Sequence, residues 1–119
     1  MLQKNVKRGD VALVVFPNSD LITAKTRPAL IVQADNLQTG LPQVVVAMIT
    51  SRMIRSIHPS RVLVLLNTIA GKQSGLLTDS VVMTDNLTTI TISSIYNVIG
   101  SLPTTEIDKA LKYTLGISS

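Results

Sequence analysis

Short apolar runs recur along most of the chain, each about the length of a β-strand and rich in valine and isoleucine. β-Branched residues favour strands, and such runs bounded by turn residues are typical of them. We therefore predict strands at residues 11–16, 28–33, 43–49, 61–66, 77–83 and 87–92. Short strands at close spacing indicate a small, strongly curved sheet or barrel.

The last part of the chain has a different period. After Leu102-Pro103, apolar and small residues fall three or four apart, which is helical spacing; they are Ile107, Ala110, Leu111, Thr114 and Leu115. Thr104 or Thr105 is placed to cap this helix, and Gly116 to end it. The sequence thus predicts a mainly β protein with a C-terminal amphipathic helix, and a shorter helical turn around residues 93–96.

Length and composition limit the kinds of protein that this chain can be. The chain has 119 residues with no repeat or linker, so we expect a single domain over residues 1–119. Only 15% of residues are charged while 45% are apolar, which favours burial of some surface in a homodimer. There is no cysteine, and His58 is the only histidine, which argues against disulfides and multi-histidine zinc sites. Neither a leader nor a membrane span is recognisable, so we expect a cytoplasmic protein. We also expect it to act without a metal or cofactor.

The positive charge is concentrated in the middle of the chain. Residues 36–78 contain no acidic side chain, and they carry Arg52, Arg55, Arg61 and Lys72. These four account for the whole net charge of +4, because the rest of the chain holds seven basic and seven acidic residues. Such a segment can attract a polyanion, although a solvated loop without acids is equally compatible with the pattern.

Three short segments could carry chemistry. Arg27 precedes Pro28 at a predicted strand entrance, where a guanidinium can bind phosphate or remain a plain surface arginine. Thr50-Ser51-Arg52 follows the third strand, and hydroxyls beside a cation can bind a phosphate or a 2′-hydroxyl. They can equally be ordinary strand terminators. His58, in the basic segment, is a candidate general base or phosphate ligand.

Several reaction types lack their motifs. We find no nucleophile elbow, no phosphate-binding glycine loop and no carboxylate cluster in the basic segment. RNA cleavage is compatible with what remains, because the 2′-hydroxyl of RNA can itself attack the adjacent phosphate. The protein then has to position the strand and stabilise developing charge, which arginines and hydroxyls can do.

A set of ordered segments resembles the PemK/MazF family from near the first residue to the last. The segments are Arg8-Gly9-Asp10-Val11, Phe16-Pro17, Thr26-Arg27-Pro28-Ala29-Leu30-Ile31-Val32-Gln33, Ile49-Thr50-Ser51, Ser74-Gly75-Leu76, Asp79-Ser80-Val81-Val82 and Ile99-Gly100-Ser101-Leu102. The resemblance implies an SH3-like, PemK-type curved β-barrel with a C-terminal helix, forming a two-fold homodimer. It also implies a toxin that cleaves single-stranded RNA without metal, leaves a 2′,3′-cyclic phosphate and is inhibited by a cognate antitoxin.

The resemblance also assigns site residues. Arg27 and Thr50 match the family's catalytic arginine and threonine. We expect Arg27 to stabilise charge, because a guanidinium is a poor base near neutral pH. The RNA-binding residues are expected to be Ser51, Arg52, Arg55, Lys25, Asn18 and His58.

One segment departs from the family pattern. Where many members read Gln, any residue, Arg, Thr, Ile, Asp, this chain has Thr88 and Thr91 in place of the arginine and the aspartate. Contacts that the family's arginine and aspartate make are not expected from these threonines, which affects RNA specificity first and activity second. Two alternatives stay open: a CcdB-like toxin that binds gyrase, and an inactive relative that binds only RNA or antitoxin. The chain has only three aromatic residues, so base stacking contributes little and a general RNA-binding module is disfavoured.

Overall fold

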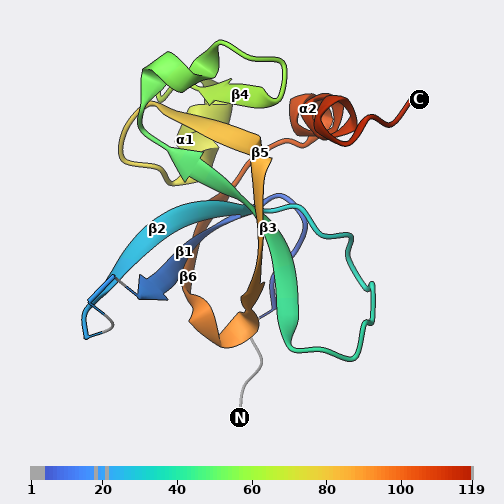
Figure 1. Ribbon diagram of the computed structural model, residues 1–119. Coiled ribbons are helices and arrows are strands. Elements are labelled where there is room, and N and C mark those ends of the chain that lie inside the picture. The colour runs from blue at the N-terminus through green and yellow to red at the C-terminus, as the bar shows by residue number, and fades with distance from the viewer. Residues whose placement is uncertain (1–4, 18, 21, 119) are drawn as a thin grey trace.

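The computed structural model describes residues 5–17, 19–20 and 22–118. Within them, six antiparallel strands form one sheet in the order β4-β5-β3-β2-β1-β6 (Figure 1). The elements are β1 (Asp10–Pro17), β2 (Ala24–Ile31), β3 (Gln43–Thr50), η1 (Met53–Ser56), β4 (Arg61–Val64), α1 (Ile69–Ser74), β5 (Ser80–Thr91), η2 (Ile92–Ser94), β6 (Ile95–Ser101) and α2 (Thr105–Leu115). The predicted class, mainly β with a C-terminal helix, is confirmed.

A bulge in β5 interrupts its pairing with β3. Met83 lies opposite Met48 of β3, but the next pair along β3 joins Ala47 to Leu87. Residues 84–86 are therefore extra on the β5 side, and such insertions bend a strand and increase its twist. In the described part of the chain, no hydrogen-bonded ladder joins the edge strands β4 and β6, so the sheet does not close. The predicted barrel is thus a strongly curved, open sheet.

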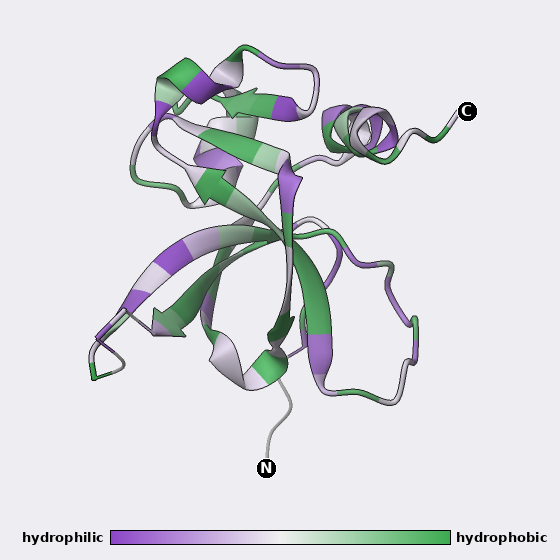
Figure 2. Ribbon diagram, in the orientation of Figure 1, coloured by the Kyte–Doolittle hydropathy of each residue, from purple (hydrophilic) through white to green (hydrophobic). Residues whose placement is uncertain are grey.

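The two faces of the sheet bury separate apolar clusters, because successive strand residues point to opposite sides. The concave cluster includes Val14, Ala29, Val46, Met48 and Met83. The other cluster contains Val11, Leu30, Ala47, Ile49, Val82 and Ile107, and is covered in part by α2. β1 and β3 are hydrophobic over most of their length, whereas the first half of β2 is hydrophilic (Figure 2).

Several predicted boundaries were wrong. β2 begins at Ala24 and not at residue 28, because pairing with β1 extends it through polar residues. The two strands predicted at 77–83 and 87–92 are one, since β5 continues through its bulge. The helical turn predicted at 93–96 is the short η2, and β6, which follows it, was not predicted.

The C-terminal helix α2 matches its prediction closely. Thr104 occupies the N-cap position, although its side chain makes no capping hydrogen bond. Gly116 ends the helix with a φ of 68°, in the left-handed region that glycine adopts freely. Arg8 ties α2 to the sheet, because its guanidinium donates to Asp108 at 2.7 Å and to the Val32 carbonyl at 2.9 Å. Among the described residues, no helix is long and apolar enough to cross a membrane.

Candidate nucleic-acid interface

Arg27 lies on the exposed first half of β2 and points to the concave face of the sheet. It pairs with Val14 of β1, a buried member of the concave cluster, and paired residues project to the same face. Lys25 lies two residues earlier, opposite Phe16, which packs against the same cluster. Both basic side chains therefore stand at the rim of the concave face.

Thr50 is the last residue of β3 and belongs to the same face. It pairs with Val81 of β5, another buried member of the concave cluster. The backbone N–H of Arg52 donates to the Thr50 hydroxyl at 3.2 Å, which fixes that oxygen at the strand end. Ser51 and Arg52 follow it and are exposed. Thr50, Ser51 and Arg52 thus follow one another at the strand end, and their joint contact with a phosphate stays a prediction.

Strands β2 and β3 separate where Arg27 and Thr50 lie. The ladder between them contains three pairs, beginning with Ala29 opposite Met48. Extended by two residues, the same register would place Arg27 opposite Thr50, but no pairing continues there. β2 and β3 diverge toward those ends (Figure 1). Arg27 and Thr50 thus lie on either side of the opening, which is the region between the two diverging strand ends on this face of the sheet.

Arg55 reaches the Thr50 side of this opening from η1. One of its guanidinium nitrogens, Nη1, lies 3.8 Å from the sulfur of Met83. Met83 pairs with Met48, and Met48 pairs with Ala29, so all three belong to one row across the sheet. This row is adjacent to the one that contains Thr50. Sequence reasoning placed Arg55 among the RNA-binding residues but gave no indication of this methionine contact.

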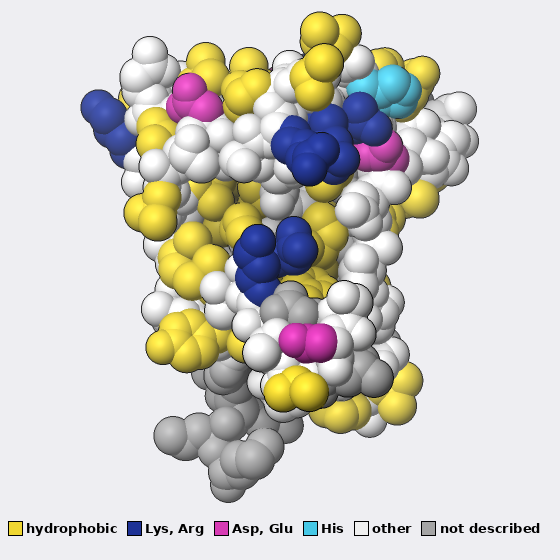
Figure 3. All heavy atoms as spheres, turned by 60° about the vertical axis from the view of Figure 1, so that its left-hand side comes forward, with side chains coloured by type: hydrophobic (Ala, Val, Ile, Leu, Met, Phe, Trp, Pro, Cys, Tyr) yellow, Lys and Arg dark blue, Asp and Glu magenta, His cyan; other side chains and the backbone are white. Residues whose placement is uncertain are grey.

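Basic side chains line both sides of the opening without carboxylate partners. In the centre of Figure 3, Lys and Arg side chains gather above and below a stretch that includes hydrophobic side chains, and further basic side chains lie apart at the upper left. In the described part of the chain, ion pairs engage only Arg8, Arg61 and Lys109. The four residues Lys25, Arg27, Arg52 and Arg55 are exposed and remain available to an anion. Arg61 is the exception in the basic segment, because Asp85 neutralises it at 2.8 Å.

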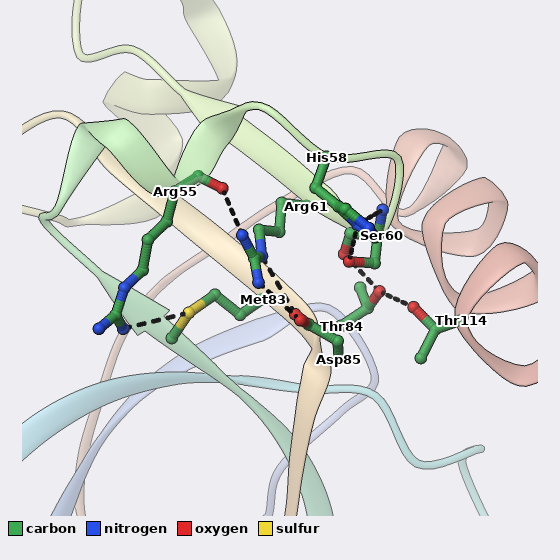
Figure 4. Close-up of polar contacts among 8 residues, drawn as sticks. All are labelled: Arg55, His58, Ser60, Arg61, Met83, Thr84, Asp85 and Thr114. Atoms are coloured by element: carbon green, nitrogen blue, oxygen red, sulfur yellow. Dashed lines mark hydrogen bonds and ion pairs between the residues drawn. The ribbon is translucent and has the colours of Figure 1, made fainter.

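His58 has a structural place in the loop before β4. Its Nδ1 accepts the backbone N–H of Ser60 at 3.1 Å and lies 2.6 Å from the Ser60 hydroxyl. Its ring packs edge-on against Tyr113 of α2, with centroids 5.9 Å apart. Among the residues labelled in Figure 4, His58 lies near α2, whereas Arg55 lies at the opposite end of the group. The contacts of His58 are thus to α2 and to its own loop.

The loop between β1 and β2 carries an acidic residue as well as the predicted site residues. Asn18 lies outside the described residues. Asp20 accepts the backbone N–H groups of Ile22 and Thr23, both at 3.0 Å, and these hydrogen bonds, led by that from Thr23, lower the pKa of its carboxyl. Asp20 therefore keeps its negative charge within the loop that leads to Lys25.

Thr88 and Thr91 occupy ordinary structural positions. Thr88 pairs with Val46 on the concave face and is half-buried. Thr91 is the last residue of β5, and its hydroxyl lies 2.8 Å from that of Ser94 and 3.2 Å from that of Ser93. Neither position places a charge on the concave face.

A cavity lined by described residues lies apart from the candidate interface. It measures about 830 Å³ and lies between the 33–42 loop and the turn after β5, where Ile31, Val44 and Ile92 line it. Ile31 ends β2 and Val44 lies near the start of β3, so this cavity is at the opposite end of those strands from Arg27 and Thr50. No three His, Asp or Glu side chains of the described residues gather as a metal site would require.

The fold and this surface define a small curved-sheet protein with an unneutralised basic opening, a class suited to binding a polyanion. A family model described as "PemK-like, MazF-like toxin of type II toxin-antitoxin system" matches residues 7–115. The chain therefore belongs to this toxin family, as its ordered segments predicted.

Solved structures share the fold. An endoribonuclease in complex with its cognate antitoxin, from a mycobacterial species, has a TM-score of 0.72 and 21% identity, covering 97% of this chain and 99% of that one. The Mycobacterium tuberculosis toxin MazF-mt6 gives 0.70 and 24%, covering 92% and 99%. A MazE-MazF structure from Deinococcus radiodurans gives 0.72 and 18%, covering 95% and 97%. The comparison with curated proteins finds no match.

Proposed function

We propose that this toxin is an endoribonuclease that cuts single-stranded RNA at the opening between β2 and β3. The observation that supports this most is the placement of Arg27 and Thr50 on opposite sides of that opening, on one face of the sheet. Arg27 has no carboxylate partner among the described residues, and both side chains are accessible. A phosphate between them would meet a guanidinium from one strand and a hydroxyl from the other.

The proposed reaction uses the substrate's own nucleophile. The 2′-hydroxyl oxygen attacks the adjacent phosphorus, and the bond from phosphorus to the 5′-oxygen breaks. The products are a 2′,3′-cyclic phosphate and a free 5′-hydroxyl, and overall one proton passes from the 2′-oxygen to the 5′-oxygen. Arg27 stabilises the charge that develops on the phosphoryl oxygens, and the Thr50 hydroxyl orients the phosphate.

The surrounding side chains would hold the rest of the strand. Lys25 extends the Arg27 side, and Arg52 and Arg55 extend the Thr50 side, so the backbone phosphates would be contacted on both sides. Ser51 adds a hydroxyl beside Thr50. Asn18 belongs to this proposal from the sequence alone. His58 contributes least, because its Nδ1 is occupied by Ser60.

The proposed partners follow from the same surface. An acidic antitoxin segment would compete with RNA for the unpaired basic side chains. This proposal is supported by the solved relatives, because one is an endoribonuclease with its cognate antitoxin and another is a MazE-MazF structure.

We further propose a homodimer acting in the cytoplasm as one domain over residues 1–119. The many exposed apolar side chains, such as Ile54, Ile57 and Tyr113, favour the dimer.

The decisive experiment is incubation of the purified, antitoxin-free protein with mixed-sequence RNA in excess EDTA, followed by mapping of both new ends. Discrete cuts ending in cyclic phosphate, lost in Arg27→Ala and retained in Lys72→Ala, are the expected result. Lys72 is a matched control, because it is an exposed cation on α1, a helix whose Ala70 packs against the apolar cluster on the other face of the sheet. Intact RNA with a folded protein would reject the enzyme; a gyrase pull-down would then test the CcdB-like alternative.

A further inference from the structure

We propose that the ion pair between Arg61 and Asp85 is a positioning device that holds η1 so that Arg55 is oriented toward RNA before RNA arrives. This inference rests on the proposed function, because it concerns how the same surface binds its substrate. Asp85 and Arg61 are positioning residues in this scheme, and Arg55 is the residue that contacts a phosphate.

The first step is the geometry of the pair itself. Arg61 donates from Nη2 to one carboxylate oxygen of Asp85 at 2.8 Å and from Nε to the other at 3.3 Å. Two parallel hydrogen bonds fix the plane of a guanidinium, which a single contact cannot do. The pKa of the Asp85 carboxyl is lowered, chiefly by the hydrogen bond from Arg61, so the carboxylate stays charged at neutral pH. The direction of the Arg61 side chain is thereby set.

The second step links this guanidinium to η1. Arg61 also donates from Nη1 to the backbone carbonyl of Arg55 at 3.3 Å (Figure 4). Because Arg55 lies in the last turn of η1, this bond holds the backbone from which its side chain projects. The Arg55 guanidinium then lies across the sulfur of Met83 at 3.8 Å, on the concave face. A chain of contacts therefore runs from Asp85 to the basic side of the opening.

The third step explains why Asp85 is available. It belongs to the 84–86 bulge, where β5 has residues that no β3 residue opposes. Thr84 anchors this bulge, because its hydroxyl donates to the Ser60 carbonyl at 2.5 Å and lies 2.8 Å from that of Thr114. Bulges commonly redirect a side chain next to a functional site. Here the bulge directs an acidic side chain toward β4 and η1, on the side where Arg61 begins β4.

A role in stability alone accounts for this arrangement poorly. The side chains of Arg61 and Asp85 are 25% and 36% exposed, and partly exposed ion pairs contribute little to folding. Ordering a long side chain on binding weakens affinity, and prior ordering removes that cost. The pair should therefore change RNA affinity more than the free energy of unfolding.

The test uses Asp85→Asn, with Glu106→Gln as matched control. Both substitutions remove one acid from an ion pair and add the same net charge, but Glu106 pairs with Lys109 on the exposed face of α2. Coulomb attraction alone predicts that Asp85→Asn binds RNA more tightly, since it frees Arg61. Positioning predicts weaker binding, by about two- to tenfold, the cost of ordering one long side chain. Affinity would be measured with a short mixed-sequence single-stranded RNA carrying 2′-fluoro groups, which prevent cleavage.

A double-mutant cycle identifies the route. If Asp85 acts through Arg55, Asp85→Asn should cause no further loss of RNA affinity in an Arg55→Ala background, where only the Coulomb effect of freeing Arg61 is left. In cleavage assays the single variant should raise KM and leave kcat unchanged. Tighter binding by Asp85→Asn, or the same loss in both backgrounds, would overturn the inference and leave the ribonuclease intact.

A readout without RNA separates the two proposals. The methyl resonance of Met83 reports on Arg55, because the guanidinium lies against that sulfur. It should shift in Asp85→Asn and stay in place in Glu106→Gln. An unchanged resonance in Asp85→Asn would overturn the inference on its own. Failure of the wild-type protein to bind or cut any RNA would instead reject the proposed function, whatever the resonance does.

Discussion

The backbone N–H of Ser60 donates to Nδ1 of His58 over 3.1 Å. An imidazole nitrogen that accepts a hydrogen bond carries no proton, so the neutral ring has its hydrogen on Nε2. Ser60 is only 1% exposed, so its backbone N–H cannot reach water and bonds to His58 instead. The finding favours a structural role for the only histidine of the chain.

His58→Asn should therefore retain stability and cleavage, since an amide oxygen can accept the same N–H. His58→Ala leaves that N–H unpaired and should lower the free energy of unfolding by about 1–3 kcal/mol. Urea unfolding and kcat for both variants would check this. A loss of kcat on the order of 10²-fold or more in a stable His58→Asn protein would instead indicate general acid–base catalysis.

Thr50 offers a similarly clean pair of variants. Its hydroxyl accepts the N–H of Arg52 at 3.2 Å, which leaves the hydroxyl hydrogen for a phosphate oxygen. Thr50→Val removes the hydroxyl at constant volume and should lower kcat by roughly 10²-fold, because the phosphate is no longer held in the geometry for attack. Thr50→Ser should remain close to wild type. Circular dichroism would establish that both variants fold, and equal kcat in Thr50→Val and wild type would remove Thr50 from the mechanism.

The sequence allowed the class of fold to be predicted better than the site. β-Branched runs located β1 and β3 to within a residue or so, and the change to helical period located α2. β6 was missed because its edge position leaves polar and exposed residues such as Tyr96 and Asn97 in the strand. The merging of two predicted strands into β5 depends on pairing across a bulge, which local pattern does not encode.

The geometry of the site also depends on strand register, which local sequence pattern does not encode. That Arg27 and Thr50 share a face follows from partners on β1 and β5, residues far from both in sequence. The pairing of Arg61 with Asp85 likewise depends on where the β5 bulge falls. Charge counting included Arg61 in the positive charge of residues 36–78, but it could not show that Asp85, which lies outside that segment, pairs with it.

The Asp85 carboxylate should make stability depend on pH in a predictable direction. Its pKa lies below the ordinary 3.8, mainly through the hydrogen bond from Arg61, so its stabilising effect is complete above that ordinary value. It is lost as the pH falls through the lowered pKa. The difference in free energy of unfolding between wild type and Asp85→Asn should thus be small at neutral pH and vanish in acid. A difference that grows as the pH falls would contradict this assignment.

Arg8 provides the largest predicted effect on the docking of α2. Its partly buried guanidinium joins Asp108 of α2 to the Val32 carbonyl after β2, at 2.7 and 2.9 Å. The side chains of Arg8 and Asp108 are 27% and 44% exposed, so their ion pair contributes little by itself, and the hydrogen bond to the Val32 carbonyl accounts for most of the effect. Arg8→Ala should therefore lower the free energy of unfolding by about 0.5–1.5 kcal/mol. Lys109→Ala is the control, because its pair with Glu106 lies at 3.4 Å between exposed side chains of one helix and should contribute about 0.3–0.5 kcal/mol. Urea titrations of both variants would measure the difference. Equal losses would mean that Arg8 does not anchor the helix and that apolar contacts such as Ile107, which is 1% exposed, hold it alone.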